Sequence, residues 1–200
     1  MIETNRHKKK ALTLDEEQVL VAKAKKDPAA FGRLYDHYQP QIFNYIYRRT
    51  GDFELANDMT SEVFLKAYTK VWTFRWQQIS IKAWFYRIAT NEVKMYFRKN
   101  DYRPASLDAL RTATGFEVTD TGHFLEEKMA AEQKMQEHQK FIAIQAVLKT
   151  LPVKYQEVIA LRYFEQHTIR EISEILNKKE GTIKSLISRG LDKIRIKIKE

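Results

Sequence analysis

Apolar side chains recur every three or four residues along most of this 200-residue chain, which is the spacing of one face of an α-helix. Only six glycines and four prolines interrupt the pattern, so few positions favour hairpin turns. The pattern predicts an all-α protein, with helices over residues 13–26, 28–49, 53–72, 82–99, 124–149, 153–164, 168–176 and 180–198.

One internal segment lacks this periodicity. Pro104, Gly115 and Gly122 lie there among scattered serines and threonines, which is typical of a flexible linker. The sequence therefore predicts two small helical domains. We expect a disordered basic arm over residues 1–11, a first domain over 12–100, a linker over 101–123 and a second domain over 124–200.

The segment 168–198 has the pattern of a helix-turn-helix followed by a basic tail. Thr168 and Glu171 have the spacing of a capping box, and Asn177 is suited to the left-handed turn that follows. The exposed face of the second predicted helix carries Thr182, Lys184, Ser185, Ser188 and Arg189. Such side chains suit base edges and phosphates in a major groove. An ordinary helical hairpin with a solvated face would show the same pattern.

The composition favours a polyanionic partner. Lysine and arginine number 35 against 26 acidic residues, a net charge of +9. A merely soluble basic protein could have the same balance. There is no cysteine, no pair of histidines at ligand spacing, no glycine-rich phosphate loop and no nucleophile motif. We therefore expect no catalytic residue, no metal, no cofactor and no small-molecule substrate.

No apolar run approaches the roughly 18 residues of a membrane span, and no signal-type segment follows the N-terminal lysines. The expectation is a cytoplasmic protein without direct membrane insertion.

An aromatic cluster, Trp72, Phe74 and Trp76 with Arg75 between, falls in a predicted loop. Rings interleaved with basic residues can stack unpaired bases. The alternative is that Trp72 and Phe74 complete the core and only Trp76 is free.

Two helix faces carry charged stripes. Arg87, Asn91, Lys94 and Arg98 are spaced by four, three and four residues, which suits a nucleic-acid backbone but also an ordinary solvated face. A second stripe has two acidic residues followed by two lysines at every fourth position, with a favourable Glu62–Lys66 pair, and could dock a partner protein or simply stabilise its helix. Its members are Asp58, Glu62, Lys66 and Lys70.

Residues 27–35, 56–68 and 82–91 resemble region 2 of bacterial RNA polymerase sigma factors. Residues 151–164 and the helix-turn-helix that follows resemble region 4. With no region 3 between them, the chain resembles the extracytoplasmic-function (ECF) group of the sigma-70 family. The resemblance implies binding to core RNA polymerase and promoter DNA, and an anti-sigma partner.

The resemblance also implies site residues. Docking on polymerase would use Asp58, Glu62, Phe64, Leu65 and Lys66. Recognition and melting of the −10 element would use Trp72, Arg75, Trp76, Arg87, Asn91, Lys94 and Arg98. Recognition of the −35 element would use Arg162, Lys179, Glu180, Thr182, Lys184, Ser185, Ser188 and Arg189.

Some positions depart from the usual family pattern, so a −35 preference does not carry over from relatives. They are Ser61, Met95, Ser173, Asn177, Lys178 and Leu186. Two other functions compete with the sigma interpretation. A stand-alone helix-turn-helix regulator would need neither the aromatic loop nor the charged stripes, and a helical protein–protein adaptor would show no salt-dependent DNA binding.

Overall fold

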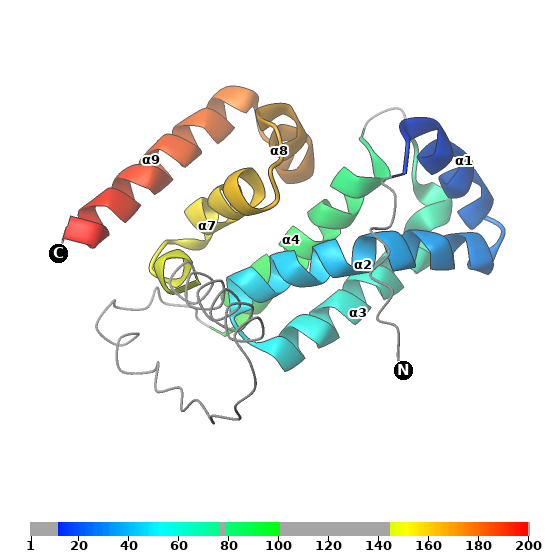
Figure 1. Cartoon of the computed structure of the whole chain (residues 1–200), viewed down its shortest axis with the longest axis horizontal. Coiled ribbons are helices and arrows are strands. Elements are labelled where there is room, and N and C mark those ends of the chain that lie inside the picture. The colour runs from blue at the N-terminus through cyan, green and yellow to red at the C-terminus, as the bar shows by residue number, and fades with distance from the viewer. Residues whose placement is uncertain (1–11, 77–78, 101–144, 200) are drawn as a thin grey trace, which may run out of the picture.

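The computed structural model describes residues 12–76, 79–100 and 145–199. Within these ranges the regular elements are all helical (Figure 1). They are α1 (Leu14–Ala24), α2 (Pro28–Thr50), α3 (Phe53–Lys70), η1 (Val71–Thr73), α4 (Ile81–Lys99), α7 (Val153–Ile159), η2 (Ala160–Phe164), α8 (Ile169–Leu176) and α9 (Glu180–Lys199).

The predicted helices are confirmed wherever they fall on described residues. Their ends agree to within about two residues, except that residues 71–73 form a separate 3-10 turn and 160–164 a π-helical turn. Of the helix expected over 124–149, the described part, 145–149, is helical. The arm and the linker lie outside the described residues.

Side-chain caps mark where the helices begin. Thr13 closes a capping box at the start of α1, and Asp27, Asp52 and Ser80 cap α2, α3 and α4 through hydrogen bonds to backbone amides. The box predicted at Thr168 is present, since its backbone amide donates to the Glu171 carboxylate at 2.7 Å. Each cap satisfies an amide that the first helical turn leaves unpaired, which sets the register of the amphipathic faces.

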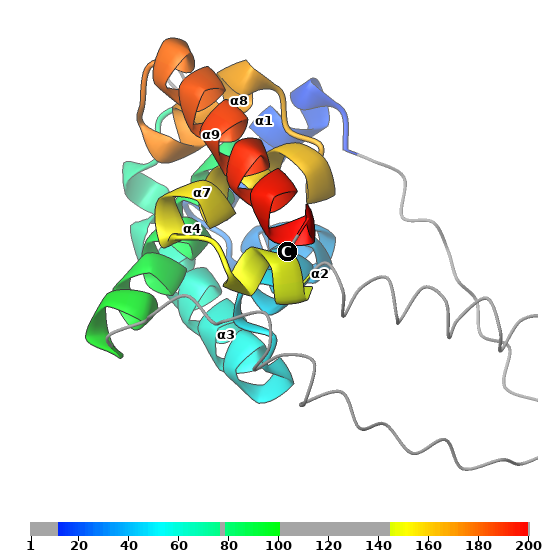
Figure 2. The same cartoon turned by 90° about the vertical axis from the view of Figure 1, so that its left-hand side faces the viewer.

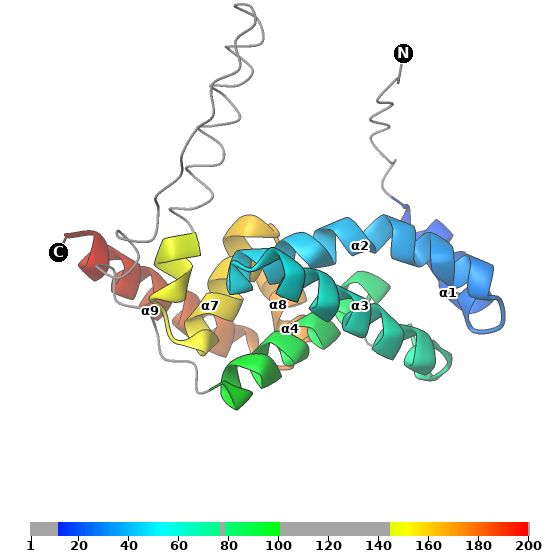
Figure 3. The same cartoon turned by 90° about the horizontal axis from the view of Figure 1, so that it is seen from below.

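Helices α1 to α4 form the N-terminal half, in which α3 packs against both α2 and α4 (Figure 3). Aromatic rings fill much of its core. Tyr38 and Phe64 both pack on Phe85, with centroids 5.3 and 5.1 Å from that ring. The tyrosine hydroxyl donates to Glu17, whose pKa is raised by burial. Large rings let so small a bundle bury enough apolar area.

Residues 145–149 and α7 to α9 form the C-terminal half. Ile172, Ile175 and Ile183 are buried between α8 and α9. Asn177 ends α8 in the left-handed conformation, with φ 51°, which confirms the predicted turn. At Gly190 an added Cβ would lie 3.2 Å from Ile159, so α9 approaches α7 closely at this position.

The two halves pack against each other, which the sequence pattern did not predict. Helix α4 lies against α8 and α7, and α2 against η2 (Figures 1 and 3). His167 is 1% exposed and meets the Tyr86 ring edge-on at 4.6 Å between centroids. The Gln145 amide donates to the carbonyl of Tyr47 at 2.9 Å. Seen from that end of the molecule, α9 lies in front of the other helices (Figure 2).

Among the described residues, no helix is both long and apolar enough to cross a membrane.

Candidate nucleic-acid and polymerase interfaces

The helix-turn-helix leaves the outer face of α9 in solvent. Ile183 and Ile187 anchor its inner face in the core, so the positions between them point outward. All eight residues predicted for −35 recognition are exposed: Arg162, Lys179, Glu180, Thr182, Lys184, Ser185, Ser188 and Arg189. In the described part of the chain, neither Lys184 nor Arg189 forms an ion pair.

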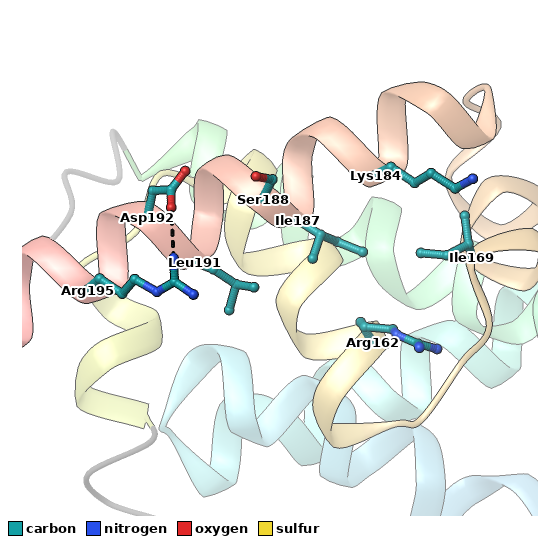
Figure 4. Close-up of a pocket in the computed structure, with 8 residues that line it drawn as sticks. All are labelled: Arg162, Ile169, Lys184, Ile187, Ser188, Leu191, Asp192 and Arg195. Atoms are coloured by element: carbon teal, nitrogen blue, oxygen red, sulfur yellow. Dashed lines mark hydrogen bonds and ion pairs between the residues drawn. The ribbon is translucent and has the colours of Figure 1, made fainter.

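A groove of about 300 Å³ runs between α9, η2 and the start of α8 (Figure 4). Arg162, Lys184, Ser188 and Arg195 line it above an apolar floor. The Arg162 guanidinium donates to the carbonyl of His167 at 2.9 Å, which holds it beside α9. Arg195 was missed from the sequence, although it follows Ser188 by seven residues on the same side of the helix.

The aromatic loop is divided between core and solvent. Phe74 is buried against Trp84, whereas Trp72 is 68% exposed and only its indole N–H is held, by the carbonyl of Thr69 at 2.9 Å. Trp76 is half-buried, edge-on to Phe74. The alternative that placed Trp72 in the core is therefore wrong, because the 3-10 turn η1 directs that ring outward.

Lys25 joins this loop from α1. Its ammonium donates to the carbonyl of Phe74 at 2.8 Å. A hollow of about 520 Å³ lies here, lined by Lys25, Trp72, Phe74, Arg75 and Trp76. Lys25 lies 49 residues before Phe74, so only the packing of α1 on η1 brings it here. A hollow with rings and cations suits a base and its phosphate.

The basic stripe on α4 is present, but two of its four members are engaged. Arg87 is half-buried and donates to the backbone carbonyl of Glu174 on α8. Lys94 lies 3.5 Å from the Glu157 carboxylate on α7. Asn91, Lys94 and Arg98 are all exposed, the Lys94 side chain by 48%.

On the α3 stripe Asp58 and Glu62 are exposed, and Leu65, the docking candidate beside it, is 58% exposed. Lys66 pairs with Glu92 on α4 at 2.6 Å and with Glu62 at 3.0 Å, and its pKa is raised, mainly by the bond to Glu92.

Phe64 does not belong to this surface. It is 3% exposed and packs in the core, so it cannot serve as the direct contact expected of it. Tyr35, which meets the Phe64 ring edge-on, is 39% exposed, and Tyr68, four residues farther along α3, is 44% exposed. Phe64 shares the buried face of α3 with Thr60 and Ala67, and this helical spacing was the signal for its burial.

Both halves of the chain match models of known protein families. The model of Sigma-70 region 2 matches residues 34–103, and that of Sigma-70 region 4 matches residues 141–194. The ECF RNA polymerase sigma factor SigW of Bacillus subtilis is 32% identical over 178 residues, covering 88% of this chain and 92% of that protein. The chain belongs to the ECF group of the sigma-70 family.

This ECF sigma factor has further relatives. The ECF RNA polymerase sigma factor BldN of Streptomyces coelicolor is 33% identical over 81% of this chain, which spans 58% of that protein. CnrH, solved in complex with the cytosolic domain of CnrY, has the same fold, with a TM-score of 0.63, 17% identity and coverage of 92% of this chain and 97% of that one.

In this ECF sigma factor, region 2 corresponds to α2–α4 and region 4 to α7–α9. A titratable residue, His167, lies where the two regions meet. Burial, and then the Lys82 ammonium, lower the pKa of His167 to about 4. The Glu171 carboxylate oxygen Oε1 lies 3.6 Å from Nδ1 of His167, which is too far for a hydrogen bond. The imidazole is therefore neutral at physiological pH.

Proposed function

We propose that this ECF sigma factor docks on core RNA polymerase through α3 and holds promoter DNA at two separate surfaces. Directing core polymerase to promoters is the function of its family. One observation supports the residue assignments. The same chain carries a polar and basic helix, α9, and a hollow lined by aromatic and basic side chains beside the basic stripe of α4.

The −35 element binds along α9. Thr182, Ser185 and Ser188 face the major groove, while Arg189 and Arg162 contact phosphates on either side of it. The support is that these side chains are exposed on a helix whose inner face is fixed in the core.

The −10 element binds in the hollow and along α4. An extruded base stacks on Trp72, with Arg75 and Lys25 placed for its phosphates. Arg98 and Asn91 follow the displaced strand along α4. Binding energy shared with polymerase opens the duplex, so the factor performs no chemistry of its own.

Polymerase docks on the face of α3. Leu65 supplies an exposed apolar contact and Asp58 and Glu62 supply charge. Tyr35 and Tyr68 extend this face in place of Phe64. Because polymerase is its partner, the factor acts in the cytoplasm, and an anti-sigma protein regulates it, as NepR is the anti-sigma factor bound to RpoE of Bartonella quintana in a solved complex of the same fold.

Reconstituted transcription with core polymerase on a library of randomised promoters tests this function. We expect transcripts that depend on both factor and promoter sequence, with two conserved elements among the active templates. Copurification without transcripts, or duplex binding that needs no polymerase and yields no transcripts, would instead support the stand-alone regulator. No DNA affinity at all would support the adaptor.

A further inference from the structure

A second line of side chains runs along the outer surface of α4, beside the basic stripe, and begins at the aromatic hollow. Its members are spaced by four, three and four residues, so they share one face of the helix. They are Trp84, Ile88, Asn91 and Met95. Trp84 packs on Phe74 of the hollow, with 5.1 Å between ring centroids. Met95, at the other end of the line, is 52% exposed.

Contacts with other helices border Met95 on both sides without covering it. On one side, Glu92 pairs with Lys66 of α3 at 2.6 Å. On the other side, Lys94 lies 3.5 Å from the carboxylate of Glu157 on α7. Around the circumference of α4, Met95 falls between Glu92 and Lys94. These flanking contacts fix the orientation of the helix face that presents the methionine to solvent.

The charge around Met95 favours a polyanionic partner over an apolar protein surface. Lys94, Arg98 and Lys99 are all exposed and lie within four residues of it. Glu92, the acidic residue of α4, is already paired with a lysine of α3. An apolar side chain among cations suits a nucleic-acid strand, because phosphates bind the cations while a base reaches the apolar group.

The chemistry of methionine restricts what Met95 can recognise on a base. Its side chain has no hydrogen-bond donor, and its sulfur is only a weak acceptor, so it cannot pair with the donors and acceptors of base edges. The apolar group on those edges is the C5 methyl of thymine. A flexible thioether chain adapts to so small a group, and covering the methyl removes apolar surface from water. Met95 therefore suits thymine better than the other three bases.

We propose that Met95 is a specificity residue that favours thymine at one position of the −10 element by covering its C5 methyl group. The basic stripe beside it, which includes Lys94 and Arg98, binds the backbone of the same strand. This inference rests on the proposed assignment of α4 to the −10 strand and adds a base preference to that assignment. Met95 is one of the positions at which the chain departs from the usual family pattern, so the preference does not carry over from relatives.

The randomised promoter library tests the preference when core polymerase transcribes it with either wild-type factor or Met95→Ala. With wild type, we expect the active templates to be enriched in thymine at one position of the −10 element. With Met95→Ala, that enrichment should fall about two- to fourfold, the factor that corresponds to one methyl group no longer removed from water. Enrichment within the −35 element should be equal for both proteins, because α9 is unchanged.

Deoxyuridine isolates the contribution of the methyl group, since it differs from thymidine only in lacking it. Placed at the same position of an active template, it should lower transcript yield at limiting wild-type holoenzyme by about two- to fourfold. It should not change the yield with Met95→Ala. Met95→Leu, which keeps an apolar side chain of similar volume, should retain the wild-type sensitivity. Val19→Ala is the matched control, because it removes a side chain that is 55% exposed on α1, and it should behave as wild type.

Two results would overturn the inference and leave the proposed function intact. One is equal thymine enrichment with wild type and Met95→Ala. The other is equal yield from thymidine and deoxyuridine templates with wild type, since the base would then be recognised by another of its groups. Failure of Met95→Ala to copurify with core polymerase would assign the side chain to polymerase docking and also overturn it. If no template is active with wild-type factor, the proposed function itself fails.

Discussion

Helices α4 and α9 both present polar and basic side chains along one stripe, but they differ in what lies over that stripe. On α9 every predicted DNA contact is in solvent. On α4, Arg87 and Lys94 contact the C-terminal half of the same chain. A basic stripe can therefore bind phosphate only where the packing of the rest of the chain leaves its side chains exposed.

A substitution in the aromatic hollow beside α4 should give the largest effect that distinguishes this surface from the one on α9. Trp72→Ala should reduce promoter opening about 5- to 150-fold, which corresponds to the roughly 1–3 kcal/mol of one base stacked on a ring. Stability should hardly change because the ring is 68% exposed. Permanganate reactivity at the start site measures opening, and duplex binding through α9 should be spared.

Phe53→Ala is the matched control, since Phe53 is 55% exposed at the other end of α3. Equal opening defects in the two variants would mean that the loss of any exposed ring suffices, and the hollow would have no special part.

The contact between Tyr86 on α4 and His167, which precedes α8, should make stability depend on pH. His167 has a pKa of about 4 when folded and an ordinary value of 6.5, so the unfolded chain binds the extra proton between these limits. Stability from this group is therefore complete above pH 6.5 and is lost as pH falls toward 4. Between pH 7 and pH 5 the loss is about 2 kcal/mol.

His167→Phe should abolish that part of the pH dependence, because a phenyl ring keeps the edge contact with Tyr86. Urea unfolding at pH 7 and pH 5 measures the difference for both proteins. The same pH dependence in variant and wild type would show that His167 is not buried as a neutral ring.

The open surface on α9 gives the smallest effect. Arg189→Ala should weaken duplex binding across many sequences and flatten the slope of log K against log salt by about 0.9 for one lost phosphate contact. Anisotropy titrations over a range of salt concentrations give the slope. Arg33→Ala, an exposed arginine on α2, should leave the slope unchanged. An unaltered slope in Arg189→Ala would remove Arg189 from the phosphate contacts.

Local signals were enough to predict most of the fold. The capping box at Thr168 and the left-handed turn at Asn177 depend on residues a few positions apart, and both are present. The exposure of the α9 face likewise follows from the spacing of Ile183 and Ile187 along a single helix. Here the periodicity of one helix determines which side is buried.

Single-helix reasoning failed where a residue's surroundings come from elsewhere in the chain. Phe64 was expected on the docking surface but lies in the core, because α2 and α4 cover that side of α3. Lys25 enters the aromatic hollow only through the packing of α1 on η1. Neither fact has a signature within a few residues of the position concerned.

The sequence by itself determined the helices, the capping box at Thr168, the charged stripes and the two family regions, because each depends on residues close together in the chain. Only the tertiary structure decided which residues of each stripe contact another part of the chain. Glu165 lies 117 residues from Arg48 and 79 from Tyr86, and both meet its carboxylate. Burying such groups between two halves depends on how the two surfaces match in shape and charge, which no local pattern encodes.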